Sequence, residues 1–212
     1  MKICILCTDP QHPVNTWLER WAEEQRAESN QVSLLRDWRD AEGGDLLFLV
    51  SCHQIVSAAV REKFQRTLVL HASALPQGRG MSPHVWQILE GADRITVTLL
   101  DAVDELDRGD IWNQIEIGFD GTELHTEIHA LLFATELRLM TWAVRHVLST
   151  QPRPQPRIQE SLYRKRVPED SRIDPQRPLV EAFDLLRIAD PDRYPVFFDH
   201  RGQRYRLRIE KM

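Results

Sequence analysis

One histidine and one acidic loop are the residues best suited to acid–base chemistry. His71 ends the apolar run TLVLH, and the acidic stretch from Asp101 to Asp110 follows the apolar run ITVTLLD. An imidazole exchanges protons near neutral pH, and a nearby carboxylate can orient it and stabilise its charged form. A single histidine at a strand end commonly has only a structural role. Chemistry here therefore requires that the fold bring an acid from the loop to His71.

Two other patterns resemble known sites, but their spacing does not support those sites. His125 and His129 share a helix face, yet H-T-E-I-H differs from the zinc-protease order H-E-x-x-H. We expect a solvated or capping role for this pair, and no metal site. The segment Gly78-Arg79-Gly80 comes several residues after a strand, and no G-x-G-x-x-G or G-K-[ST] is present. A dinucleotide-binding domain is therefore not expected.

Covalent catalysis has no local support in the sequence. The three cysteines, Cys4, Cys7 and Cys52, form an odd set at low density, which favours reduced thiols. Cys4 and Cys7 lie three apart in one apolar run, so in a strand they would face opposite sides and serve packing. No serine lies in a nucleophile elbow. The first ten residues indicate a strand and not a signal peptide, so a cytoplasmic location is expected.

Alternating strands and helices would position His71 and the acidic loop. Short apolar runs predict strands, and longer patterns between them predict helices, as in the βαβ units of an α/β fold. The result is a Rossmann-like, mainly parallel sheet with helices on both faces, whose site lies at the carboxyl ends of its strands. The predicted strands are 2–7, 31–35, 45–51, 67–71, 95–101 and 111–117, and the helices are 14–27, 54–64, 83–89 and about 122–148.

Within this scheme, the loops after Ser51, His71 and Asp101 are the places to look for chemistry. The helix that follows His71 has a well-defined start, because Ser82 can cap it and Pro83 suits its first position.

A proline-rich stretch divides the chain. Residues 151–157 read QPRPQPR, in which missing amides exclude a helix or a central strand. We expect a catalytic domain at 1–150, a linker at 151–160 and a small C-terminal α+β appendage at 161–212. The appendage should contain a short helix at 178–188 and a hairpin of 194–198 with 203–209. It should pack on the main body or on a second subunit.

Composition and charge exclude several classes of protein. The chain has 212 residues, 42% of them hydrophobic and 28% charged, and no apolar run approaches the roughly 18 residues of a membrane span. Its net charge of −5 is uneven, because residues 151–212 carry +4 and residues 1–150 carry −9. An acidic body is poorly suited to nucleic acid, so neither a membrane nor a nucleic acid is an expected partner.

The sequence around these residues resembles a known family. The runs 70-LHASALPQGRGMSPHVWQILEG-91 and 97-VTLLDAVDELDRGDIW-112 are similar to the core of the folate-dependent formyltransferases. That family includes methionyl-tRNA, glycinamide ribonucleotide and amino-sugar formyltransferases, and its pattern is N-x-H-x-S-x-L-P, then R-G-x-x-P, then L-D-x-G-D. The match is good over roughly residues 45–117 and holds in outline elsewhere.

The resemblance implies a cosubstrate and a set of site residues. The catalytic histidine falls on His71, the catalytic aspartate on Asp107, and the usual asparagine on Val69, which has no donor. The implied cosubstrate is N10-formyltetrahydrofolate, with no metal. Its pterin is expected against two segments, made of His53, Gln54, Ile55 and Val56 and of Val103, Asp104, Glu105 and Leu106.

The C-terminal tail resembles that of sugar N-formyltransferases, which implies a nucleotide-linked amino sugar as acceptor and allows a homodimer. The motif form is nearest to enzymes of pseudaminic-acid-type pathways and to formylation domains of peptide synthetases. A tRNA acceptor is disfavoured because the tail is short and mildly basic. The expected acceptor-binding residues are Ser73, Arg79, Gly80, Ser82 and Trp86. Arg79 either binds a diphosphate or braces its loop, and Trp86 and Trp112 either stack on the acceptor or pack against the sheet.

The mechanism implied is direct acyl transfer, in which His71 relays the proton of an attacking amine while Asp107 fixes the imidazole. Losing one oxyanion donor costs on the order of 100-fold or more unless another group replaces it. Two alternatives therefore stay open: a hydrolase that releases formate from the folate, and a non-catalytic module that binds folate or a sugar nucleotide.

Overall fold

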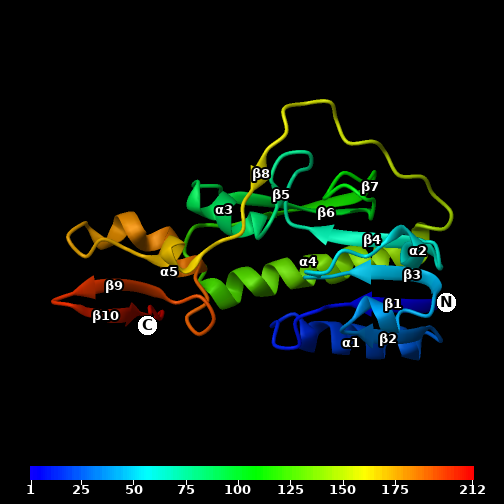
Figure 1. Ribbon diagram of the computed structural model, residues 1–212, viewed down its shortest axis with the longest axis horizontal. Helices are drawn as coiled ribbons and strands as arrows, with labels where there is room; N and C mark the ends of the chain where they lie inside the picture. Colours follow the sequence, from blue (N-terminus) through cyan, green and yellow to red (C-terminus); the bar gives the residue numbers. More distant parts are fainter.

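A six-stranded sheet forms the centre of the main body (Figure 1). The computed structural model describes residues 1–212. The strand order is β2-β1-β3-β4-β6-β7, with parallel pairing from β2 to β4 and antiparallel pairing from β4 to β7. The mainly parallel sheet predicted from the sequence is thus confirmed. Its strands are β1 (Lys2–Leu6), β2 (Gln31–Leu35), β3 (Gly44–Leu49), β4 (Phe64–His71), β6 (Arg94–Asp101) and β7 (Ile111–Gly118).

The first strand shows why the sheet needs cover on both faces. Side chains alternate along a strand, so Ile3, Ile5 and Cys7 enter the large core on one face, and Cys4 and Leu6 enter a smaller core on the other. All five are buried, so the strand reads as an unbroken apolar run. The two cysteines serve packing on opposite faces, as predicted, and all three thiols are free.

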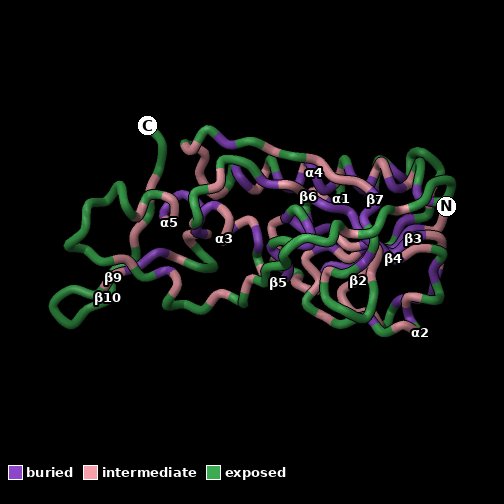
Figure 2. The backbone as a smooth tube through the Cα atoms, turned by 90° about the horizontal axis from the view of Figure 1, so that it is seen from above, coloured by how far each residue is buried: buried purple, intermediate pink, exposed green.

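Two helices, α1 (Asn15–Ala27) and α4 (His125–His146), cover the face with the larger core. Trp21 of α1 joins them, because its ring meets Phe48 edge-on at 6.0 Å and its Nε1 donates to Thr141 Oγ1 at 2.8 Å. Figure 1 shows α4 running along the sheet and projecting beyond its edge. Buried residues concentrate in the sheet and along these two helices (Figure 2).

The opposite face carries little helix, which corrects one expectation. The predicted helix at 54–64 shortens to α2 (Ala58–Arg61), and η1 (Trp38–Asp40) completes the cover. Residues 52–57 instead form a loop, in which Ile55 is 89% exposed. Helical spacing is present here, but the β-branched pair Ile55 and Val56 disfavours helix and the loop positions Val56 in the smaller core.

The direction of β6 corrects a second expectation. The loop after Asp101 was expected beside His71 because carboxyl ends of parallel strands share an edge. However, β6 is antiparallel to β4, so Asp101 lies opposite Leu68 while His71 lies opposite Thr98. Residues 102–109 must therefore double back along β4 to reach His71, and Asp101 N donates to Asp110 O at 2.9 Å where the loop closes.

The segment after α4 returns over the main body, as the arch in Figure 1 shows. Arg153 and Ile111 exchange two backbone hydrogen bonds, of 2.7 and 2.9 Å, at the edge of β7. Further along, β8 (Leu162–Tyr163) pairs in parallel with β5 (Arg79–Gly80), a two-stranded sheet that sequence patterns did not predict. The C-terminal segment therefore holds the loop that follows His71.

The last residues form a small lobe at one end of the molecule (Figure 1). It contains η2 (Pro168–Ser171), η3 (Leu179–Ala182), α5 (Phe183–Ile188) and a hairpin of β9 (Val196–His200) with β10 (Gln203–Leu207). Leu186, Ala189 and Val196 form its own small core, and Arg187 and Lys211 form ion pairs with Glu123 and Glu127 of the main body. None of the helices has the length and apolar composition needed to span a bilayer.

Candidate active site

His71 is held between two acceptors at the end of β4. Its side chain is 7% exposed. Its Nε2 lies 2.8 Å from the Gly78 carbonyl oxygen, and its Nδ1 lies 3.6 Å from Asp107 Oδ1. The first distance is a hydrogen bond, and the second is an ion-pair distance that is too long for one. The two residues that the resemblance paired are therefore neighbours.

Three contacts hold the loop that presents Asp107. The backbone of Asp107 is left-handed, with φ of 54°, and its side chain is only 6% exposed. Its Oδ2 accepts a 2.9 Å hydrogen bond from Gly80 N. Gln155, in the returning segment, donates to the carbonyl oxygens of Asp107 and Gly109 at 2.7 and 2.9 Å. The carboxylate is thus oriented by the loop after β4 and by the proline-rich stretch.

Acceptors on both sides of His71 determine what its ring can do. A neutral imidazole has one donor and one acceptor nitrogen, so it cannot donate to both Gly78 O and Asp107. Only the imidazolium, which carries a proton on each ring nitrogen, can donate to both Gly78 O and Asp107. A ring that exchanges a proton with a ligand must therefore release the Gly78 carbonyl, while Asp107 stays beside Nδ1.

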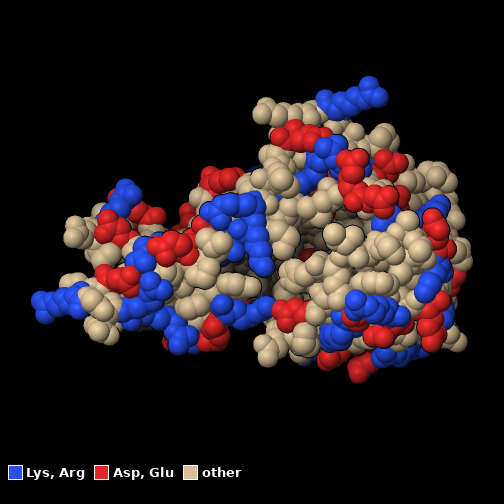
Figure 3. Space-filling view, viewed as in Figure 1, with Lys and Arg blue, Asp and Glu red and all other residues tan.

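A cavity of about 510 Å³ opens beside His71. Figure 3 shows a hollow between the main body and the C-terminal lobe, with basic side chains gathered at its margin. One set of lining residues, 51–56 and 101–107, comes from two loops and is here called the loop half. A second set, here called the histidine half, consists of His12, His84, His129, Phe133 and Glu136.

Arg61 links the two segments of the loop half. Its Nη1 donates to the Val56 carbonyl at 2.6 Å, and its Nη2 contacts Asp104 Oδ1 at 2.5 Å. The apolar side chains of Ile55 and Leu106 remain 89% and 61% exposed, and both residues line the cavity. Arg61 falls within the helix predicted at 54–64, and that pattern gives no sign that its side chain joins two loops.

The predicted site residues divide into two groups. The residues of the two predicted pterin segments line the cavity, as do His71, Asp107, Gly80 and Ser82, whereas Ser73, Arg79 and Trp86 do not. Arg79 is buried and forms an ion pair with the Glu160 carboxylate. Its contact braces the loop after β4 against the C-terminal segment.

Both tryptophans considered for stacking on an acceptor are engaged by the protein itself. The Trp86 ring stacks on Tyr163 at 6.1 Å, and its Nε1 donates to the Arg164 carbonyl at 3.0 Å. Trp112 is buried, and its Nε1 donates to Asp101 Oδ1 at 2.8 Å. Desolvation raises the pKa of the Asp101 carboxyl.

The start of α3 (Pro83–Leu89) differs from the predicted cap. Ser82 is left-handed, with φ of 50°, and its side chain makes no capping hydrogen bond. A capping serine normally has an extended backbone, so the geometry of the preceding loop overrides the local preference. Pro83 occupies the first turn as predicted.

Val69 lines the cavity two residues before His71 and so lies on the same side of β4. It packs beside Leu75, Leu100 and Ile111. The position that the resemblance assigns to an asparagine therefore offers only methyl groups to a bound ligand.

The histidine half contains imidazoles that stay neutral. Rings of His84 and His129 lie 5.7 Å apart, and those of His129 and His125 lie 4.1 Å apart. Desolvation is the main cause that lowers the pKa of His12 to about 4, of His84 to about 3 and of His129 to about 2. The expected solvated or capping role for His125 and His129 is wrong, because the two rings are largely shielded from solvent and lie against each other at an interplanar angle of 57°. No group of three or more His, Cys, Asp or Glu side chains could hold a metal ion.

These imidazoles predict a loss of stability in acid. The unfolded chain takes up protons on them below pH 6.5, but the native protein does not until the pH is well lower. The free energy of unfolding should therefore fall as the pH decreases from 6.5 towards 4, measured by urea titration. His84→Gln should reduce this slope, whereas His200→Gln, at an exposed site, should not. Equal slopes in both variants would contradict the prediction.

Glu136 is the residue that sequence analysis missed most clearly. It is 7% exposed, and desolvation alone raises its pKa to about 8. It lies on α4 in register with Ile128, Leu132 and Met140, at intervals of four residues, all of them buried. A carboxylate on a buried helical stripe was the signal that could have revealed it.

Comparison with known proteins identifies the family to which this fold and site belong. Residues 8–144 match the family model described as formyl transferase, well over half of the chain. The chain belongs to the formyl transferase family.

Among curated proteins, the methionyl-tRNA formyltransferase of Bacillus velezensis is 30% identical over 131 residues, which cover 61% of this chain and 41% of that protein. The chain spans about half the length of the curated relatives it matches.

Three solved structures share the fold. A methionyl-tRNA formyltransferase from Clostridium thermocellum has a TM-score of 0.83 at 20% identity, covering 100% of this chain and 93% of that one. A 4-N formyltransferase from Francisella tularensis has a TM-score of 0.77 at 20% identity, covering 100% and 98%. HypX from Aquifex aeolicus in complex with tetrahydrofolic acid has a TM-score of 0.78 at 21% identity, covering 96% and 36%.

Proposed function

We propose that this protein transfers a formyl group from N10-formyltetrahydrofolate to the amine of a nucleotide-linked amino sugar. The observation that supports this most is the His71–Asp107 pair, which borders one cavity together with both predicted pterin segments. When bound, the folate would supply the formyl carbon as electrophile. The solved relative in complex with tetrahydrofolic acid supports a folate as the formyl donor. The relative named a 4-N formyltransferase supports an amine as the acceptor.

The residues of this chain fit a folate. Exposed Ile55 and Leu106 would contact the faces of the pterin ring, and Arg61 would keep their two segments together. His71 would accept the amine proton at Nε2 after its bond to Gly78 O is released, and would return it to N10 of tetrahydrofolate as the bond between the formyl carbon and N10 breaks. Asp107 would hold the ring by Nδ1 and stabilise its charged form.

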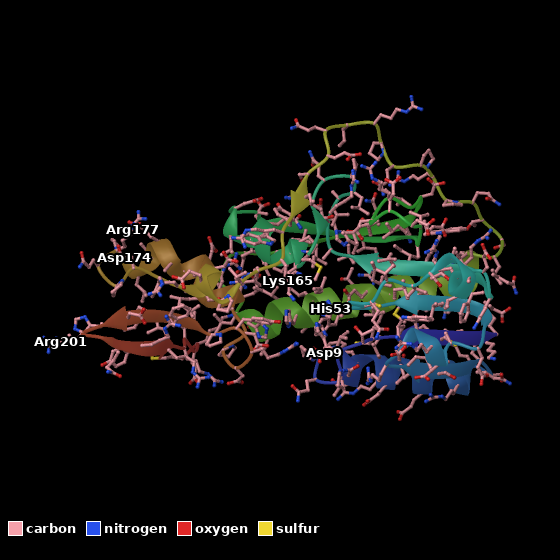
Figure 4. All side chains as sticks on the ribbon, viewed as in Figure 1. Asp9, His53, Lys165, Asp174, Arg177 and Arg201 are labelled. Carbon is pink, nitrogen blue, oxygen red and sulfur yellow. The ribbon has the colours of Figure 1, made fainter.

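The basic side chain that could contact an anionic acceptor lies outside the cavity lining. Arg79 is neutralised by Glu160, so it is a poor candidate for the diphosphate. Lys165 is exposed and forms no ion pair or side-chain hydrogen bond. Figure 4 places it near the middle of the molecule with His53 and Asp9, whereas Asp174, Arg177 and Arg201 lie far out on the C-terminal lobe. We infer that Lys165 is a better candidate for contact with a diphosphate.

The direct test is incubation with N10-formyltetrahydrofolate, with and without acceptors. The acceptor panel should contain thymidine- and uridine-diphosphate-linked 4-amino sugars, and also methionyl-tRNA, because curated relatives carry that name. Tetrahydrofolate release that depends on an amino sugar would support the proposal. Release without acceptor would indicate a hydrolase, binding without turnover a non-catalytic module, and release only with methionyl-tRNA a different acceptor.

Val69 offers a gain-of-function prediction. Val69→Asn would place an amide donor in the cavity beside His71, and we expect kcat to rise roughly 10-fold or more, because one well-placed oxyanion donor contributes on the order of 100-fold. Initial rates at saturating substrates measure this effect. Val69→Ala changes the volume without adding a donor and should not raise kcat. A faster Val69→Ala would mean that space, and not hydrogen bonding, limits the reaction.

A further inference from the structure

Glu136 is a buried carboxyl group that the protein itself does not satisfy. Its residue is 7% exposed, and Oε2 is buried without any hydrogen-bond partner. It also lines the cavity that His71 borders. Most buried polar side-chain atoms in proteins have a partner, so an unsatisfied one beside a cavity calls for a specific explanation.

Packing does not explain this glutamate. Leu132 and Met140 lie one turn before and one turn after it on α4, and both are buried. A leucine at position 136 would continue that apolar stripe, whereas an unpaired buried carboxyl group is destabilising. A group that costs stability and has no partner in the chain is explained if its partner is a ligand.

The surroundings of Glu136 define the chemistry of that ligand. The histidine half offers hydrogen-bonding groups without charge, since its imidazoles stay neutral, and His129 Nδ1 is also buried without a partner. Phe133 adds an aromatic face, 5.0 Å from the His129 ring. The only Lys or Arg that lines the cavity is Arg61, in the loop half. Neutral donors and acceptors around an aromatic face suit a hydroxyl-bearing ring and do not suit a phosphate.

We propose that Glu136 and His129 form the subsite that binds the sugar ring of the acceptor by hydrogen bonds to its hydroxyl or amino groups. This inference rests on the proposed function and assigns the two halves of the cavity to different substrates. The loop half takes the folate and the histidine half takes the sugar, and His71 lines the same cavity.

The test compares Glu136→Gln and Glu136→Leu with the wild type. We expect the KM for the amino-sugar acceptor to rise roughly 10-fold or more, the effect of one buried hydrogen bond, while the KM for N10-formyltetrahydrofolate changes less than about twofold. His129→Phe should act in the same direction. Glu23→Leu, at an exposed site on α1, is the matched control and should change neither constant.

The Tm measured without ligands separates a binding role of Glu136 from a structural one. Removing a structural side chain would lower Tm, whereas removing an unpaired buried carboxyl group should raise it. Because the carboxyl group has no partner, Glu136→Leu should raise Tm by about 2–4 °C. A markedly lower Tm would show that Glu136 stabilises the protein, and an unchanged acceptor KM would show that it does not bind the sugar. Either result would overturn the proposal.

Failure of the proposed function gives a different pattern. In that case the wild type transfers formyl to no amino sugar in the panel, and the two Glu136 variants are then compared by Tm and by tetrahydrofolate affinity. A raised Tm with unchanged folate affinity would support a ligand subsite outside the folate half. Weakened folate binding would place Glu136 with the folate and contradict the assignment.

Discussion

Replacing His71 by alanine should lower kcat/KM for formyl transfer by about 10³-fold, within the range that general acid–base groups contribute. The imidazole is the one proton-exchanging side chain held against Asp107 at the cavity, with Nδ1 at 3.6 Å from Oδ1. Tetrahydrofolate affinity should change less than about twofold, because the loop half does not depend on this ring. Steady-state rates and a tetrahydrofolate titration measure the two quantities.

The controls separate chemistry from folding. His71→Gln keeps a side-chain amide that can still donate to the Gly78 carbonyl, so its loop should stay in place while activity is lost. Asp107→Asn should lower the rate less than His71→Ala, because the imidazole remains but loses its compensating charge. His200→Ala, in the exposed hairpin, should have no effect. A His71→Ala protein that keeps a tenth or more of the wild-type rate would refute the catalytic assignment.

Replacing Gly109 by alanine should abolish transfer for a structural reason. A Cβ atom at this position would lie 1.8 Å from the carbonyl oxygen of Asp101. Asp101 cannot move away freely, because its backbone N donates to Asp110 O and its carboxylate accepts from Trp112. The closed end of the loop must open, and Asp107 then leaves His71. We expect a loss of activity comparable to His71→Ala and a stability loss of roughly 2–4 kcal/mol.

Gly118→Ala is the matched control for that substitution. A Cβ atom there would have its nearest neighbour 4.0 Å away, at the Asp93 carbonyl oxygen, and the backbone does not require a positive φ. This variant should keep the activity and the urea midpoint of the wild type. If Gly109→Ala were as active as Gly118→Ala, the closed loop would not be needed to place Asp107.

The pattern of hydrophobic residues was sufficient to predict most strands and helices of the main body. The strand at 31–35 and the helix at 83–89 form with the predicted bounds. The strand is a short apolar segment, and the helix has Pro83 in its first turn, where a fixed φ favours helix. The predicted helix at 54–64 forms only at Ala58–Arg61. The local spacing of apolar residues favours a helix there, but contacts with the rest of the protein hold residues 52–57 in a loop. Loop residues there keep Ile55 exposed beside the cavity, and hydrophobic periodicity carries no information about such a requirement.

Contacts between distant segments could not be predicted in the same way. The parallel pair of β5 and β8 consists of two residues on each side, too short for any periodicity to reveal. The charge of Arg79 left two roles open, a diphosphate contact or a brace for its loop, because its partner Glu160 lies 81 positions further along the chain. Glu136 was passed over because a glutamate in a helix is usually exposed.

The amino-acid sequence by itself determined the apolar strands, the alternation that makes the sheet mainly parallel, and the two residues, His71 and Asp107, that the family motif pairs. Only the tertiary structure decided how they meet, because β6 runs antiparallel to β4 and its loop must turn back to deliver the carboxylate. It also decided that Arg79 braces a loop and that Glu136 faces a cavity. Side-chain direction and strand orientation arise from contacts between segments far apart in the chain, and local patterns do not encode them.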